Sequence, residues 1–205
     1  MRFHQKSKKT AIIIQHIFLF FMILASPIIC STNYAFADVS DTSFVIFAGQ
    51  ATENDVGDWI NSNHTFQDSY QAGIGINHRL WKGGKSALEA EAMVMNHSGD
   101  QSYTELNAML VFRWLRFPWD EHIDTSFAVG EGLSYADAIP DIERFYHTNT
   151  NRLLNFILLE LEFSLRDSPG WGMVFRWHHR SGAFGLFNEV KGASDFLVWG
   201  LRYHY

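Results

Sequence analysis

One stretch near the end of the chain combines a histidine, a serine and a carboxylate, three residue types suited to ester hydrolysis. His179 and Ser181 are separated by a single residue, and Asp195 follows after a glycine-containing segment. A serine hydroxyl is a poor nucleophile until a base takes its proton, and a carboxylate can orient that base and stabilise its cation. Ser181, His179 and Asp195 are therefore candidates for nucleophile, general base and orienting acid, with no metal or cofactor required. Contact with the phosphates of surface lipid is an alternative role for His179 beside Arg180.

Whether these three side chains meet depends on the strands that carry them. Successive side chains of a strand point to opposite faces. His179 therefore shares a face with Trp177, and Ser181 does so too if the strand continues that far. Asp195 shares a face with Leu197 in the next segment. If both apolar faces turn toward lipid, the three groups converge on the outer surface of one sheet.

The chain after residue 42 is a series of alternating segments separated by turn residues. Eight strands are predicted: Ser43–Ala51, Ser69–Leu80, Lys85–Asn96, Tyr103–Phe117, His122–Tyr135, Leu153–Arg166, Trp171–Arg180 and Ser194–Tyr205. Short Gly- or Pro-containing connections alternate with longer, more polar ones, which is typical of outer-membrane barrels. We therefore predict an all-β fold, an eight-stranded antiparallel up-and-down transmembrane β-barrel, with little or no helix in its core.

The two faces of the predicted strands differ in character. One is apolar and aromatic, and the seven Trp, seven Tyr and 18 Phe suit rings that lie at two membrane interfaces. The other is predicted to hold small and charged groups that pair inside a narrow barrel. Eight charged residues are expected to form a buried ion-pair network that fills the lumen: Glu89, Glu91, Glu105, Glu160, Glu162, Arg113, Arg166 and Arg176. A soluble lipocalin-like barrel, the alternative, requires an apolar interior.

The N-terminal residues have the order of a secretory signal peptide. Four basic residues among the first nine precede a long apolar run, and Ala35-Phe36-Ala37 forms a cleavage box. We expect residues 1–37 to be removed, leaving one barrel domain of residues 38–205 in the outer membrane of a Gram-negative bacterium. A retained transmembrane anchor is the alternative, because the apolar run is long enough to span a bilayer.

Cleavage after Ala37 changes the charge of the chain. The remainder carries 12 basic and 22 acidic residues, a formal net charge of −10. Such an acidic chain is a poor partner for nucleic acid. The only cysteine, Cys30, would be removed as well, so no disulfide could hold the fold.

A known family resembles the C-terminal part of the chain. The segments His179–Ala183, Gly192–Asp195 and Gly200–Tyr203 resemble the signature of the lipid A 3-O-deacylases, often grouped as acyloxyacyl hydrolase-like proteins. Members of that family are eight-stranded outer-membrane barrels that hydrolyse an ester-linked acyl chain of lipid A with a His-x-Ser motif and a downstream acid. The resemblance implies Ser181 as nucleophile, His179 as general base and Asp195 as acid. It also implies lipid A or lipopolysaccharide as the partner.

The chain departs from that family directly after the serine. The family motif continues His-x-Ser-Asn, whereas Gly182 stands where that Asn, an oxyanion donor, is expected. An oxyanion hole needs donors near the developing charge rather than one particular residue. The backbone N–H of Gly182 and the side chain of Asn188 are the candidate donors. Tyr205 resembles the C-terminal aromatic residue by which the barrel-assembly machinery recognises such proteins.

Other functions remain open from the sequence. A noncatalytic barrel would stabilise the envelope or use its loops for adhesion. An acyltransferase barrel would use similar nucleophile chemistry but bind its acyl donor inside the barrel, where charged residues are expected. Calcium binding by the loop acids Glu53, Asp55 and Asp58 would be nonspecific, and the histidines show no convincing metal-ligand spacing.

Overall fold

The computed structural model describes most of the chain from residue 41 onward. The described residues are 41–53, 65–121, 123–146, 149–165, 168, 170–183, 186–187, 190 and 193–205. Several residues singled out in the sequence lie outside these ranges: the predicted signal peptide (1–37), the loop acids Asp55 and Asp58, Arg166, and the oxyanion candidate Asn188.

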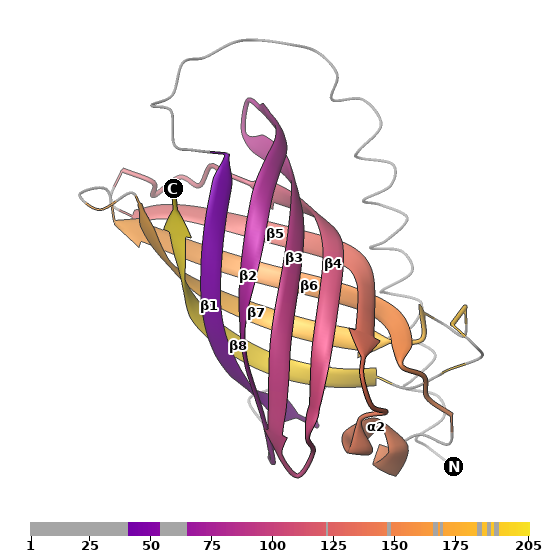
Figure 1. Ribbon diagram of the computed structural model, residues 1–205. Coiled ribbons are helices and arrows are strands. Elements are labelled where there is room, and N and C mark those ends of the chain that lie inside the picture. Colours follow the sequence, from indigo (N-terminus) through magenta and orange to yellow (C-terminus); the bar gives the residue numbers. More distant parts are fainter. Residues whose placement is uncertain are drawn as a thin grey trace, which may run out of the picture. The chain divides into compact units, whose positions relative to one another are not determined.

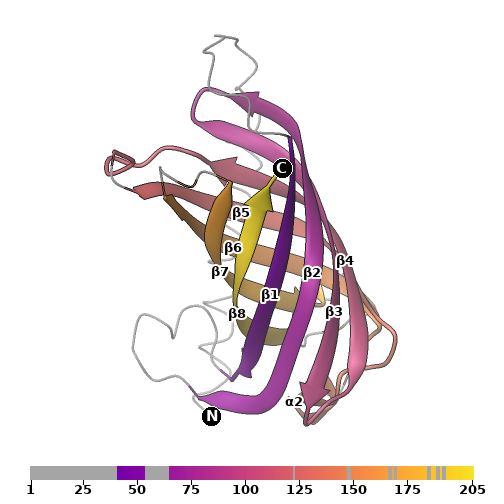
Figure 2. The ribbon, with the colours of Figure 1, turned by 60° about the vertical axis from the view of Figure 1, so that its left-hand side comes forward.

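The described residues form eight strands and one short helix. The strands are β1 (Thr42–Thr52), β2 (Phe66–Gly83), β3 (Ser86–Gly99), β4 (Tyr103–Trp114), β5 (Ile123–Ala136), β6 (Leu153–Leu165), β7 (Trp171–Ser181) and β8 (Ala193–His204). Each strand pairs antiparallel with the next, and β8 pairs with β1, which closes the barrel (Figure 1 and Figure 2). All eight predicted strands are confirmed, with ends that shift by at most three residues.

The two ends of the barrel differ in their connections. At the turn end, short connections join β2 to β3, β4 to β5 and β6 to β7; Gly84 takes a φ of +58°, a left-handed conformation that favours glycine. At the loop end, longer connections join β1 to β2, β5 to β6 and β7 to β8. The β3–β4 connection, residues 100–102, is short, so the predicted alternation fails there, because β3 continues to Gly99. The helix α2 (Asp141–Tyr146), which was not predicted, lies in the β5–β6 connection at this end (Figure 1).

The predicted ion-pair network occupies part of the lumen. Arg113 contacts Glu160 at 2.7 Å and Glu89 at 3.0 Å, and Arg176 contacts Glu91 at 2.8 Å. Arg202 completes the network with contacts to Glu91, Glu160 and Glu162. All of these residues are buried. Because every charge has a partner of opposite sign, the lumen can hold them without leaving an isolated buried ion.

The lumen is less uniformly charged than predicted. Glu105 lies apart from the arginines, between His97 at 2.8 Å and His178 at 3.2 Å. The buried residues also include an apolar cluster: Val45, Phe47, Ala51, Met93, Met95, Met109, Val111, Ala128, Phe156, Leu158, Val174, Phe196 and Val198. The interior therefore combines ion pairs with apolar packing, which adds an apolar part to the small and charged inward groups that were predicted.

The outward face is the inverse of a soluble protein surface. Large apolar side chains such as Ile46, Ile74 and Leu110 are more than half exposed along the strands. Near the turn end, exposed aromatic residues include Trp81, Trp114 and Trp171. A continuous apolar surface of this size is stable only against lipid. Among the described residues, no helix has the length and apolar character to cross a membrane.

Candidate active site

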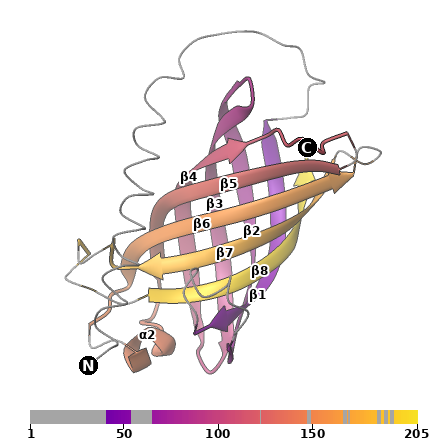
Figure 3. The same cartoon turned by 180° about the vertical axis from the view of Figure 1, so that it is seen from behind.

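The predicted site residues lie on β7 and β8 at the loop end of the barrel. Their side of the barrel, strands β5 to β8, is in front in Figure 3. His179 and Asp195 are directly paired across the β7–β8 ladder, and Ser181 is the last residue of β7. All three belong to the outward-facing set, in phase with the exposed Phe175 and Trp199. The three side chains therefore share the outward face, as the alternation of the two strands predicted.

A hydrogen bond joins the histidine to the carboxylate. The Nδ1 atom of His179 lies 2.7 Å from Oδ1 of Asp195. A carboxylate can only accept, so Nδ1 carries the hydrogen and, in the neutral imidazole, Nε2 is left with its lone pair free. Both residues are nearly buried, at 9 % and 7 % exposure, which protects this bond from competing water. The pair therefore presents Nε2 as a base in a fixed tautomer.

Ser181 stands beside this pair and is partly exposed. It and His179 are alternate residues of one strand, so their Cα atoms are about 6.6 Å apart. Among the hydrogen bonds of the described residues, none joins the Ser181 hydroxyl to His179. The structure thus brings His179 and Asp195 into direct contact, and it places Ser181 on the same face without a hydrogen bond to the imidazole.

Trp177 covers one side of the imidazole. The two rings are stacked with centroids 4.6 Å apart and an interplanar angle of 19°. Trp177 is also outward-facing and nearly buried, and its Nε1 has no hydrogen-bond partner among the described residues. The stack and the bond to Asp195 together restrict rotation of His179. The alternation of the strand predicts only that Trp177 faces lipid, so this contact was not predicted.

The backbone of Val190 comes so close to position 182 that only glycine fits there. A Cβ at this position would lie 2.1 Å from the carbonyl oxygen of Val190, closer than real Cβ contacts allow. The loop folds back tightly here, since Phe187 N–H donates to the Gly182 carbonyl at 3.2 Å. An asparagine at position 182, as in the motif that this segment resembles, would therefore clash with the Val190 backbone.

Two further polar residues, Glu131 and Asn155, extend the site across the sheet. Asn155 pairs directly with Ser181, while Glu131 pairs with Ile157, which in turn pairs with His179. Both share the outward orientation of the site residues, and Asn155 is 7 % exposed. Neither residue was predicted to belong to the site, although a polar residue at a lipid-facing position of a strand indicates a functional role.

Arg180 points into the barrel and not toward the lipid beside His179. Its side chain points inward, is fully buried, and donates to Glu143 of α2, to the Ser134 hydroxyl at 2.9 Å and to the Arg152 carbonyl at 2.6 Å. It is therefore not available to contact lipid phosphates beside His179. Instead it ties the end of β7 to α2.

The site lies at a boundary between polar and apolar surface. One step from His179 toward the turn end, Leu159, Trp177 and Leu197 are paired neighbours on the outward face. One step toward the loop end, Asn155 and Ser181 are paired neighbours. A lipid ester has the same polarity change, with a head group on one side and an acyl chain on the other.

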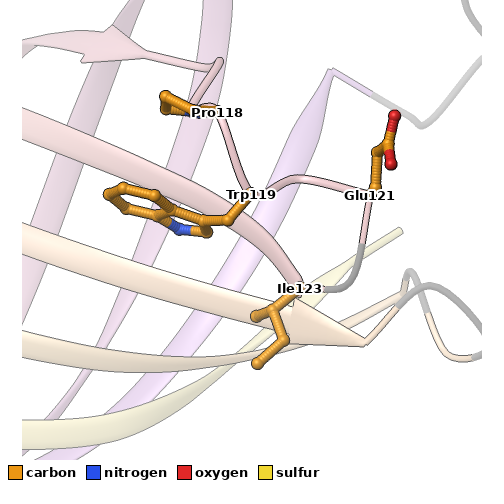
Figure 4. Close-up of a pocket in the computed structure, with 4 residues that line it drawn as sticks. All are labelled: Pro118, Trp119, Glu121 and Ile123. Carbon is orange, nitrogen blue, oxygen red and sulfur yellow. The ribbon is translucent and has the colours of Figure 1, made fainter.

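The pocket shown in Figure 4 lies elsewhere. It has a volume of ≈ 370 Å³ and is lined by Pro118, Trp119 and Glu121 of the β4–β5 turn and by Ile123, the first residue of β5 (Figure 4). Because this turn is at the opposite end of the barrel, the pocket is separate from the candidate active site. In the part of the chain that the structure describes, no cluster of three or more His, Cys, Asp or Glu is placed to hold a metal ion.

Comparison with known proteins supports the fold. No protein-family model and no curated protein sequence matches the chain. The outer membrane enzyme PagL matches with a TM-score of 0.53 and 14 % identity, over 77 % of this chain and 97 % of PagL. Neisserial surface protein A (NspA) matches with a TM-score of 0.50 and 10 % identity, over 81 % of this chain and 98 % of NspA. The chain therefore has the fold of the small barrels of the Gram-negative outer membrane. One of these two structures, PagL, is an enzyme.

Proposed function

We propose that this protein is a serine esterase of the outer membrane that removes an ester-linked acyl chain from lipid A or a related outer-leaflet lipid. The observation that carries the proposal is the 2.7 Å bond between His179 Nδ1 and Asp195 Oδ1 on the outward face beside Ser181. The likeness of the His179–Ala183 segment to the lipid A 3-O-deacylase motif supports the substrate class. The outward orientation of the site supports attack on a lipid that stays in the membrane.

The reaction follows from the arrangement of the three groups. Ser181 Oγ attacks the ester carbonyl carbon while its proton passes to His179 Nε2, and Asp195 stabilises the imidazolium that forms. The tetrahedral intermediate collapses, and the lipid hydroxyl leaves with the proton from Nε2. Water then attacks the acyl-enzyme with His179 as base, which releases a fatty acid and regenerates Ser181.

The developing oxyanion needs at least one hydrogen-bond donor. Under this proposal the donors are the backbone N–H of Gly182 and the side chain of Asn188, which follow Ser181 in the loop. Loss of a single oxyanion donor costs about 10²–10³ in kcat in a serine protease. A glycine at 182 is compatible with this role, because a backbone N–H donates whatever the side chain.

Mass spectrometry of lipid A tests the proposal directly. The full-length protein, S181A and H179A are expressed at matched levels in a Gram-negative host, with S98A as control because Ser98 is an exposed outward serine on β3. The parent and S98A are expected to remove one acyl mass, and S181A and H179A to remove none. An unchanged lipid A profile with a folded parent would contradict the proposal and favour a structural or adhesive barrel.

We further propose that residues 1–37 are the signal peptide of this barrel. Intact-mass measurement of the protein extracted from outer membranes is expected to give a chain that begins at Asp38. A mass that includes the apolar N-terminal run would instead show a retained anchor.

A further inference from the structure

Glu131 and Asn155 form a second polar pair on the lipid-facing surface, next to the proposed nucleophile. Residues directly opposite each other in an antiparallel pair have Cβ atoms about 4.5–5.5 Å apart. Asn155 is opposite Ser181 in this sense, and Glu131 is one strand further along. Both side chains therefore border the place where the acyl ester would bind.

The pair is held in a fixed orientation. The Asn155 Nδ2 group donates to Oε1 of Glu131 and, at 3.1 Å, to the carbonyl oxygen of Gly132. Both partners are acceptors, so the amide nitrogen must point toward them and its two hydrogens are used. None of the hydrogen bonds among the described residues uses Asn155 Oδ1 or the second oxygen of Glu131.

A polar pair of this kind is unusual among the outward-facing residues of β5 and β6. Polar and charged side chains on the lipid face of a barrel are destabilising, and elsewhere on the outward faces of β5 and β6 apolar residues such as Val129, Leu133 and Leu159 predominate. With Glu131 ionised, the remaining oxygens of Glu131 and Asn155 accept hydrogen bonds but cannot donate them. They would repel a phosphate and attract a hydroxyl or an amide N–H.

We infer that Glu131 and Asn155 are specificity-determining residues that accept a hydrogen bond from a hydroxyl or amide group next to the scissile ester. The inference rests on the proposed esterase function and narrows its substrate: a donor-bearing acyl ester is preferred over an ester of a plain fatty acid. A hydrogen bond to a charged acceptor contributes about 1.5–3 kcal/mol, which corresponds to a preference of about 10- to 100-fold.

A pair of esters that differ in one hydroxyl tests this inference. The probes are the 4-nitrophenyl esters of decanoic acid and of 3-hydroxydecanoic acid, presented to the purified barrel in the same detergent micelles. E131L and N155L remove the acceptors and insert an apolar side chain that suits the lipid face. N96L is the matched control, since Asn96 is an outward-facing asparagine at the loop end of β3 that accepts a bond from Thr104.

The ratio of kcat/KM for the two esters is the measurement that decides. The parent and N96L are expected to prefer the hydroxy ester at least about tenfold, and E131L and N155L to lose that preference because their kcat/KM for the hydroxy ester falls further than that for the plain ester. Variants that keep the preference, or that lose both activities equally while folded by heat-modifiable gel mobility, would overturn the inference alone. A folded parent that hydrolyses neither ester would overturn the esterase function and the inference with it.

Discussion

At the scale of single residues, Asp195 decides which nitrogen of His179 can act as a base. The carboxylate holds the hydrogen on Nδ1 at 2.7 Å, and Nε2 is the only other ring nitrogen. In D195N, the amide can present its N–H₂ to Nδ1 and so favour the tautomer in which Nε2 is protonated and cannot accept the serine proton.

We predict that D195N lowers kcat by about 10²- to 10⁴-fold with little change in KM. Steady-state kinetics with the plain 4-nitrophenyl ester measures the effect, and heat-modifiable mobility on gels confirms that the barrel is folded. Parent-like kcat in D195N would mean that another carboxylate, with Glu131 the nearest alternative on this face, orients the base.

The second residue-scale prediction concerns Gly182. If its departure from the family asparagine had simply removed an oxyanion donor, G182N would raise activity. We expect the opposite, because the new Cβ would lie 2.1 Å from the carbonyl oxygen of Val190. Overpacking at such a site costs about 1–3 kcal/mol. G182N should therefore lower kcat and make the β7–β8 loop more sensitive to limited proteolysis, whereas a gain in kcat would contradict the steric explanation.

How much of the site could be predicted differs from residue to residue. Period-two alternation was enough to place His179, Ser181 and Asp195 on one face, because that property is local to each strand. The direct pairing of His179 with Asp195 depends on the β7–β8 register, which a long loop does not fix. Glu131 and Asn155 enter the site through the β5–β6 and β6–β7 registers, so no short motif could reveal them.

At the scale of elements, the strands were predictable and α2 was not. Each strand carries its own alternation and is bounded by turn residues, which are signals in the local sequence. The helix α2 has six residues, too few for a helical period to be recognised. It is nevertheless fixed to the barrel through Glu143, which is fully buried and accepts from Arg180 and from the Ser194 hydroxyl at 3.1 Å.

The contact between α2 and β7 predicts a stability effect. E143A would leave the buried Arg180 without its ionic partner, and breaking a buried pair in this way costs about 3–5 kcal/mol. We expect a lower urea midpoint for unfolding in lipid vesicles, together with reduced esterase activity, because Arg180 lies between His179 and Ser181. D141A is the control in the same helix: Asp141 and Arg144 are exposed and 4.0 Å apart, and such a pair contributes less than about 1 kcal/mol. Equal midpoints for E143A and D141A would show that α2 does not hold the end of β7.

At the scale of the whole molecule, the barrel places ion pairs inside and apolar side chains outside. The arginine–glutamate network needs closure, because Arg202 is on β8 and its partners come from β3 and β6, neither of which pairs with β8. The sequence revealed which residues are inward and charged. It did not reveal that Glu105 pairs with histidines and not with the arginine network. That pairing depends on the strand register, which sets the height of each residue along the barrel.

The inverted arrangement predicts how the barrel responds to a charge on its surface. Ile46 is near the middle of β1, outward-facing and 56 % exposed, whereas Ser98 is outward-facing at the loop end of β3. An arginine at the bilayer midplane costs about 2–4 kcal/mol, and near an interface about 0–1 kcal/mol. I46R should therefore lower the free energy of unfolding in lipid vesicles by the larger amount and S98R by the smaller one. If the two variants unfolded at the same urea concentration, Ile46 would not face the hydrocarbon core, and the outward band could not be a transmembrane surface.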